Sequence, residues 1–263
     1  MSEENVEIRN EAVRRFVAAF EDDDSFRDTL HPEIEWYPIE ENRTPTRGVK
    51  AAMWNRNQWL DTWEEHRLDV EEVIEDGDSV VALIHIQARG KASGVEVDVR
   101  FYAQIKVRDG KIVYIYDHED REAALEAAGL WEKAMSQENV EVVRRCLEAF
   151  QDDEETWLQT LDPDLVWYPI EDGHIPARGI DGAKGVRQRW LDTWEGHSIA
   201  VEDLRGAGEN VVGTIHVGGR GRGSGVEVNL RAYPHWKVRD GRIVYAFEYP
   251  DRASAIESAG LSE

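Results

Sequence analysis

Two kinds of hydrophobic periodicity follow one another along the first half of the chain. Val13, Phe16, Val17 and Phe20 recur at the i, i+3, i+4, i+7 spacing that places apolar side chains on one face of an α-helix. From about residue 68 onward, apolar and polar residues alternate instead, as they do in strands that bury one face. The pattern therefore predicts helices packed on one face of an antiparallel sheet, which is an α+β domain.

Turn-forming residues set the limits of the predicted elements. We expect a short strand at 34–39, a helix at 49–65 and a closing helix at 120–128 that Gly129 ends. An Asp-Gly pair between two alternating runs is a strong hairpin signal, and such pairs occur at 76–77 and 109–110. The sheet is therefore predicted to be a meander of four strands, near residues 68–75, 79–88, 94–107 and 111–118.

The whole pattern then occurs a second time. Residues 31–130 align with residues 162–261 at a constant offset of 131 without a gap, with 49 identities in 100 pairs. A period of this length is too long for a solenoid repeat, so each copy is a complete domain. We predict two domains, 1–132 and 133–263, joined without a long flexible linker.

Charge and cysteine content narrow the range of partners and locations. The chain has 54 acidic and 31 basic residues, a net charge of −23, which would repel nucleic acid and anionic membranes. Cys146 is the one cysteine, so a disulfide framework is excluded. There is no apolar run of membrane-spanning length and no signal-peptide pattern at the start, so we expect a cytoplasmic protein.

Several motifs keep the same order in both halves. They are a Trp-Tyr-Pro strand, a tryptophan-rich helix, Ser-Gly-Val-Glu-Val, Arg-Asp-Gly followed by a strand, and the closing alanine-rich helix. This order resembles the SnoaL-like branch of the nuclear transport factor 2-like superfamily. The resemblance implies two tandem cone-shaped α+β barrel domains, each a curved antiparallel sheet wrapped by helices around a pocket. Relatives include polyketide cyclases, ketosteroid isomerases and limonene-type epoxide hydrolases, so the fold by itself does not choose a function.

The resemblance also implies how the two copies are used. Many single-domain relatives form dimers through their sheet faces, so the fused copies are expected to form an intramolecular pseudo-dimer and the chain to be a monomer. In the strand at 95–107, Val97 and Phe101 share one face while Arg100 lies on the other. We therefore expect the apolar face to line the cone and Arg100 and Arg231 to lie at an interface.

Two ionisable pairs are the candidates for chemistry. His85 stands within an apolar strand, Asp117 ends the last strand of the first copy, and His216 and Glu248 occupy the same places in the second. The functional interpretation is a histidine and a carboxylate that act together as acid and base in one pocket. The alternatives are a core histidine with satisfied hydrogen bonds and a carboxylate that caps the following helix.

Aromatic and apolar residues are the candidates for binding a ligand. The tryptophans could pack the core or form the pocket wall, and the histidines that follow them could bind ligand or interact with helix carbonyls. The predicted ligand-binding residues are Trp36, Trp63, His66, Val97, Val99 and Phe101 in the first copy, and Trp167, Trp194, His197, Val228 and Leu230 in the second. No short ligand spacing indicates a metal site, and no cofactor is expected.

Comparison with the catalytic relatives shows departures. In the epoxide hydrolases an aspartate matches Asp117, but His85 replaces a second aspartate and Leu83 replaces an arginine of that family's triad. In the ketosteroid isomerases an aspartate precedes the proline where this chain has Tyr37 and Tyr168. Neither mechanism is therefore carried over intact.

The sequence leaves several functions open. The preferred interpretation is a pair of domains that bind a small, largely apolar organic molecule, with cofactor-free acid–base catalysis of an isomerase, cyclase or hydrolase type. The alternatives are a non-catalytic carrier, or one active half with a structural partner half. The copies differ around the expected pocket, at Asn42-Arg43-Thr44 against Gly173-His174-Ile175, at Gln87 against Gly218, and at Gln104-Ile105 against His235-Trp236. These differences favour different ligands or unequal roles.

Overall fold

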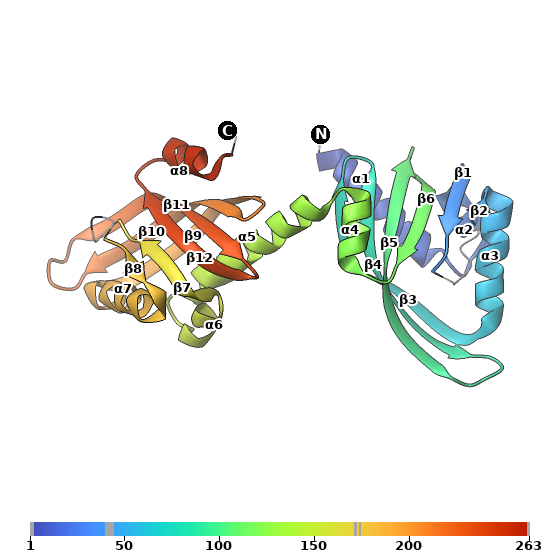
Figure 1. The fold of residues 1–263 in the computed structure, drawn as a ribbon, viewed down its shortest axis with the longest axis horizontal. Helices are drawn as coiled ribbons and strands as arrows, with labels where there is room; N and C mark the ends of the chain where they lie inside the picture. The colour runs from blue at the N-terminus through green and yellow to red at the C-terminus, as the bar shows by residue number, and fades with distance from the viewer. Residues whose placement is uncertain (1–2, 40–44, 171–172, 174, 262–263) are drawn as a thin grey trace. The chain divides into compact units, whose positions relative to one another are not determined.

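The chain folds into two compact units, residues Met1–Trp131 and Glu132–Glu263. Figure 1 shows the computed structural model, which describes residues 3–39, 45–170, 173 and 175–261. The predicted differences at residues 42–44 and 174 lie outside these ranges. Among the described residues, no helix has the length and apolar character needed to cross a membrane.

Each unit consists of a six-stranded sheet with helices, which is the α+β architecture that the hydrophobic pattern predicts, although the sequence predicted only five of the strands. The strand order is β2-β1-β6-β5-β4-β3 in the first unit and β8-β7-β12-β11-β10-β9 in the second. The first unit contains α1 (Glu3–Ala18), α2 (Asp23–Thr29), β1 (Leu30–Tyr37), β2 (Thr46–Arg47), α3 (Val49–Thr62), β3 (Trp63–Asp76), β4 (Ser79–Gly90), β5 (Glu96–Arg108), β6 (Lys111–His118) and α4 (Arg121–Ala128).

The second unit repeats these elements in the same order. It contains α5 (Trp131–Ala149), α6 (Glu154–Gln159), β7 (Leu161–Tyr168), β8 (Ala177–Arg178), α7 (Gly179–Thr193), β9 (Trp194–Ala207), β10 (Asn210–Gly221), β11 (Glu227–Arg239), β12 (Arg242–Tyr249) and α8 (Arg252–Ala259). The segment that joins the two copies is helical, because α5 begins directly at Trp131.

Sheet pairing follows the hairpin signals. Strands β3 to β6 pair in sequence as an antiparallel meander, whereas β1 joins the edge of β6 in parallel. At the β5–β6 turn Asp109 and Gly110 both have positive φ, 51° and 70°, as a two-residue type I′ turn requires. Asp240 and Gly241 form the equivalent turn in the second unit, with φ of 50° and 71°.

The two faces of each sheet are covered differently. In the first unit, apolar residues of α1, α2 and α3 form one buried cluster with Ile34, Ile84, Ile105 and Ile115 of the sheet. On the opposite face α4 packs near β5, where Gln104 Nε2 donates to the carbonyl of Ala127 at 3.0 Å. The inner face, beneath α1 to α3, is therefore the one that can enclose a cavity.

A buried arginine fixes the helix layer in both units. In the second, Arg187 of α7 donates from Nε to the Phe150 carbonyl at 2.7 Å and from Nη2 to the Gln151 carbonyl at 3.1 Å. Its Nη1 lies 3.0 Å from Oε2 of Glu154, and its guanidinium stands over the Trp157 ring. In the first unit Arg56, only 1% exposed, binds the Phe20 carbonyl in the same way. The arginine thus satisfies carbonyls that α5 leaves free where it ends.

We predict that Arg187→Met destabilises the second unit by about 2–4 kcal/mol, because buried carbonyls would lose their donors. Urea unfolding followed by circular dichroism measures the change. The exposed Arg145, on α5, supplies the control, since Arg145→Met should alter stability by less than about 0.5 kcal/mol. Equal stability of the two variants would contradict the role given to the buried guanidinium.

Candidate functional site

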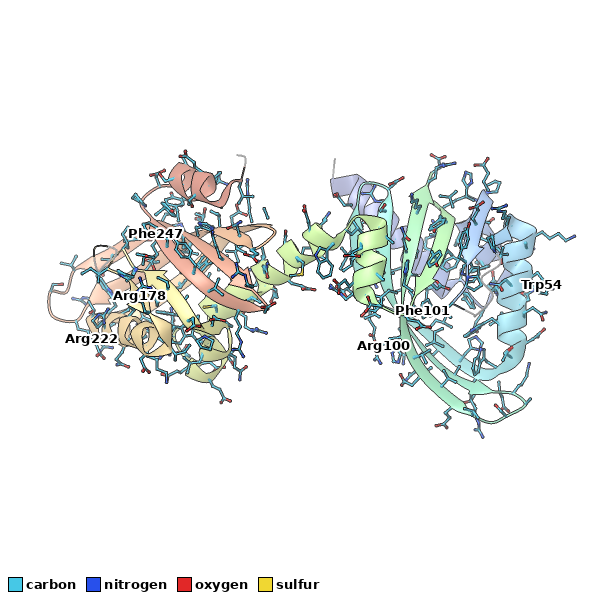
Figure 2. The ribbon with its side chains drawn as sticks, viewed as in Figure 1. Trp54, Arg100, Phe101, Arg178, Arg222 and Phe247 are labelled. Atoms are coloured by element: carbon cyan, nitrogen blue, oxygen red, sulfur yellow. The ribbon has the colours of Figure 1, made fainter. Side chains whose placement is uncertain are left out.

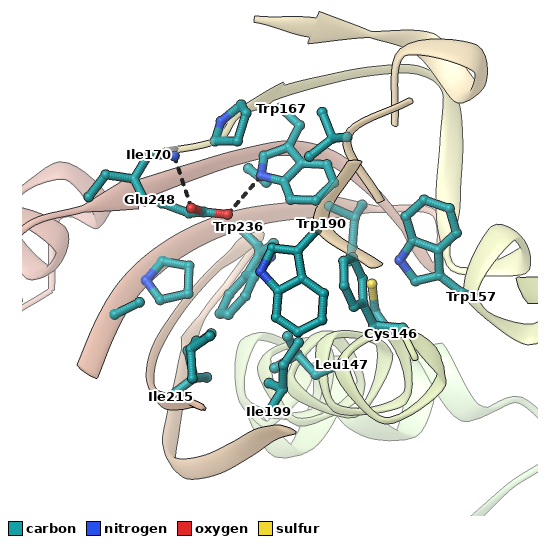
Figure 3. A pocket seen from close by; sticks show the side chains of 18 of the residues that line it. Cys146, Leu147, Trp157, Trp167, Ile170, Trp190, Ile199, Ile215, Trp236 and Glu248 are labelled. Atoms are coloured by element: carbon teal, nitrogen blue, oxygen red, sulfur yellow. Dashed lines mark hydrogen bonds between the residues drawn. The ribbon is translucent and has the colours of Figure 1, made fainter. Parts of the chain in front are cut away.

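Each unit encloses a cavity between its helix layer and the inner face of its sheet. The first cavity has a volume of about 740 Å³ and the second about 310 Å³. Both are within or near the range of small-molecule sites. Figure 3 shows the second cavity, in which Trp167, Trp190 and Trp236 stand around the space.

In each cavity a carboxylate stands at the same place in the fold. Asp117 of β6 is 6% exposed, and Trp36 Nε1 donates to its Oδ2 at 3.4 Å. The parallel pairing of β1 with β6 sets Trp36 opposite Ile115, which brings its indole within reach of Asp117.

In the second unit the same carboxylate position is held from two sides. Trp167 Nε1 donates to Glu248 Oε1 at 3.1 Å, and the Ile170 amide donates to Oε2 at 3.0 Å (Figure 3).

The helix-capping alternative does not apply to either carboxylate. Asp120 and Asp251 cap α4 and α8, because their side chains accept from the amides of Ala123 and Ser254.

The two histidines do not enter the cavities, contrary to the expectation that each shares a pocket with its carboxylate. Ile84 and Ile86 of β4 line the first cavity, so His85 between them points to the opposite face. The same alternation directs His216 away from the second cavity, which Ile215 and Val217 line. His85 and Asp117, and likewise His216 and Glu248, therefore lie on opposite faces of one sheet.

On that outer face the histidines belong to networks of charged groups. His85 Nδ1 lies 3.0 Å from Glu71 Oε1, and its Nε2 lies 2.8 Å from Asp98 Oδ1. Arg100 makes two hydrogen bonds to Glu71, at 2.8 and 2.9 Å, and these lower the pKa of Glu71. In the second unit His216 and Arg231 share Glu202. The predicted polar face of the sheet is thus present.

Most of the predicted ligand-binding residues line the cavities. They are Trp36, Trp63, Val97, Val99 and Phe101 in the first, and Trp167, Trp194, Val228 and Leu230 in the second. The strand period of two correctly predicts the inward direction of those that lie on β5 and β11, which are Val97, Val99, Phe101, Val228 and Leu230.

His66 and His197 are the exceptions. Neither lines a cavity. Helices α3 and α7 end at Thr62 and Thr193, earlier than predicted, so the histidines fall within β3 and β9. Their rings pack against tryptophans instead, with centroids 5.2 Å apart for His66 and Trp59 and 4.7 Å for His197 and Trp190.

Several lining residues were not identified as ligand-binding from the sequence. In the first cavity these include Trp54, Asn55 and Gln58, all on α3. In the second, Trp236 lines the cavity where Ile105 stands in the first. Comparison of the two copies could have identified Trp54 and Trp236. At an offset of 131, Trp54 aligns with Gly185 and Trp236 aligns with Ile105, so each tryptophan is present in one copy only.

Cys146 also lines the second cavity but is not a candidate nucleophile. Burial raises the pKa of its thiol to about 11, so the side chain stays protonated near neutral pH and packs as a small apolar group. Within the described part of the chain, no three His, Cys, Asp or Glu side chains are arranged to hold a metal ion.

His235, which replaces Gln104 of the first copy, lies on the outer face and is 2% exposed. Its Nε2 lies 3.0 Å from Asn210 Oδ1, and its Nδ1 lies 2.9 Å from the Ser258 hydroxyl. Burial, with a smaller contribution from Lys237, lowers the pKa of His235 to about 4. The imidazole is therefore neutral in the folded protein at neutral pH.

This lowered pKa predicts a pH-dependent stability. An unfolded histidine has a pKa near 6.5, so its contribution is complete above that value and is lost as the pH falls toward 4. His235→Gln introduces the residue that the first copy has at this position. Between pH 6.5 and 4, the free energy of unfolding of this variant should fall by up to roughly 3 kcal/mol less than that of the native chain. Urea unfolding across this range measures the slope, and equal slopes for variant and native chain would contradict the assignment.

Comparison with protein families identifies what the two units resemble. The model of the SnoaL-like domain matches this chain twice, at residues 13–115 and 143–246. A search of curated proteins found no match.

Solved structures of single domains match one unit at a time. A putative SnoaL-like polyketide cyclase from Jannaschia sp. CCS1 is 18% identical and matches 49% of this chain and 96% of its own, with a TM-score of 0.39. An epoxide hydrolase of the limonene type from M. tuberculosis is 20% identical and matches 47% of this chain and 90% of its own, with a TM-score of 0.38. A hypothetical protein with a ketosteroid isomerase-like fold from Catenulispora acidiphila, in complex with trimethylamine, is 16% identical and matches 46% of this chain and 94% of its own, with a TM-score of 0.39. These similarities say nothing about activity.

Proposed function

This chain belongs to the SnoaL-like domain family, with one domain in each half, and from that premise we propose that each half binds a small, largely apolar organic molecule. The observation that carries the proposal is the cavity itself. In both halves a tryptophan-lined, largely apolar space contains a carboxylate that an indole N–H holds at the same strand end.

The lining of the cavity defines the kind of molecule that would fit. Aliphatic and indole side chains offer apolar surface, so burial of apolar ligand surface would supply most of the binding free energy. Asp117 or Glu248 would accept a hydrogen bond from a hydroxyl of the ligand. Because Trp36 and Trp167 already hold these carboxylates in place, little conformational freedom would be lost on binding.

Removal of the carboxylate charge tests the proposed anchor. We expect the Asp117→Asn, Glu248→Gln double variant to bind 2-naphthol about 10- to 100-fold more weakly than the native chain, because a hydrogen bond to a charged group contributes roughly 1.5–3 kcal/mol. Isothermal titration calorimetry measures the affinities. Naphthalene, which has no hydroxyl, is the matched ligand whose affinity should stay within about twofold. An equal loss for both ligands would show that the variant disturbs the cavity and would contradict the anchoring role.

Acid–base catalysis is the second candidate function, and the fixed position of the carboxylate favours it. A carboxylate held in an apolar cavity can take a proton from a bound carbon acid or from water. The histidines cannot assist in the cavity, since they lie on the other face of the sheet. Of each predicted histidine–carboxylate pair, only the carboxylate, Asp117 or Glu248, could therefore take part in such a reaction.

Turnover assays separate an enzyme from a carrier. We expect an enolisable cyclic ketone or a small epoxide to be converted by the native chain and at least 100-fold more slowly by the Asp117→Asn, Glu248→Gln variant, since general-base catalysis contributes about 10²–10⁴-fold. Product formation followed by chromatography measures the rate. Binding without turnover of either substrate would favour the carrier function.

Two further predictions from the sequence concern assembly and location. The pairing of the two sheets within one monomeric chain and the cytoplasmic location stay predictions.

A further inference from the structure

The two cavities differ in how polar they are as well as in volume. The first, of about 740 Å³, is lined near α3 and the end of β6 by Asn55, Gln58, Thr62 and Glu119 in addition to Asp117. Among the described residues that line the second, of about 310 Å³, Glu248 is the one charged side chain and no amide side chain is present.

The difference lies along one wall, which is formed by α3 in the first unit. Trp54, Gln58 and Thr62 are four residues apart and so lie along one side of this helix, with Asn55 beside them. Trp54 lines the cavity yet is 64% exposed, so it stands at the opening of the cavity. Figure 2 labels this side chain on α3. An exposed tryptophan beside a cavity provides a large apolar surface that the folded core does not use.

The equivalent wall of the second unit has lost these groups. Gly185, Val186 and Arg189 of α7 stand where Trp54, Asn55 and Gln58 stand in α3, and only Val186 of these lines the second cavity. Along its helix the second cavity therefore lacks the exposed tryptophan and the amide groups that line the first.

We propose that the two halves hold different ligands, and that Trp54 and Asn55 determine the difference. This inference rests on the proposed function. The first half takes an elongated molecule whose apolar body fills the cone and whose hydroxyl end reaches Asn55 and Gln58 at the opening, against the Trp54 ring. The second half takes a compact apolar molecule that ends at Glu248.

Desolvation explains why the walls select in this way. A hydroxyl buried in the second cavity away from Glu248 would lose its water without gaining a partner, which is unfavourable. In the first cavity, the amides of Asn55 and Gln58 can donate to or accept from a hydroxyl that stays close to solvent. Each methylene between the apolar body of the ligand and its hydroxyl adds apolar surface. Burial of one such methylene strengthens binding roughly fourfold.

Fluorine NMR on the full chain labelled with 5-fluorotryptophan tests the proposal. The Trp54 and Trp236 resonances are assigned from Trp54→Phe and Trp236→Phe, and the probes are 3-phenylpropan-1-ol and 8-phenyloctan-1-ol. We expect the short probe to shift Trp236 without shifting Trp54, and the long probe to shift Trp54. Isothermal titration calorimetry then gives the affinity of each binding event.

Two sets of variants make the result specific to the wall. Trp54→Ala with Asn55→Val should weaken binding of the long probe by roughly 3- to 10-fold, the range expected for one aromatic contact, and leave the short probe unchanged. Trp54→Phe should retain affinity. Gly185→Trp should strengthen binding of the long probe at the second site. The substitution fits, because a Cβ added at Gly185 would meet only the end of the Arg189 side chain, at 3.4 Å.

The outcomes separate the two proposals. If both probes shift Trp236 and neither shifts Trp54, or if the wall variants weaken both probes equally, ligand binding stands and the difference between the halves is overturned. If neither probe shifts any tryptophan resonance, both the proposed function and this inference fail.

Discussion

The alternation of side chains along the long strands is the constraint on which the candidate site depends. Each residue of β4, β5 and β6 must face either the cavity or the outer surface, and its neighbours then take the other face. Because Ile84 and Ile86 occupy the cavity side, His85 joins Glu71 and Asp98 outside it. The same rule leaves Asp117 inside. The separation of the ionisable groups is thus a consequence of strand geometry.

The inner face needs support from the helix layer to remain a cavity. Arg56 and Arg187 supply it in the two units by donating to carbonyls near the ends of α1 and α5. A charged group at this depth is stabilised because Nε and Nη1 of each arginine bind a carbonyl and a carboxylate, and because the ring of Phe26 or Trp157 lies beneath the guanidinium. The tryptophan–carboxylate bond at the strand end is the second fixed point, and both recur in each copy.

The duplication shows which parts of the domain tolerate change. The turns, the buried arginine and the tryptophan beside the carboxylate are shared, whereas the cavity walls differ. Trp236 replaces Ile105, and Gly213 lies so close to its indole that an added Cβ would come within 2.8 Å of the ring. Ala82 stands at that position in the first copy. Changes at neighbouring positions therefore compensate one another, so that one fold can enclose two differently shaped spaces.

The sequence by itself determined the tandem repeat, the order of the longer helices and strands, the Asp-Gly turns and the inward face of β5, because each is a local or periodic property. It did not determine which way His85 faces. Residues 80–82 of β4 are buried on both faces of the sheet, so the strand is apolar throughout and its alternation cannot be seen in the sequence. The sequence also did not show that Arg56 binds a buried carbonyl or that Trp54 stands at the opening of a cavity. Helical spacing tells which residues share a face of the helix, but not what that face contacts. Those assignments depend on contacts between elements distant in the chain, which only the tertiary structure decides.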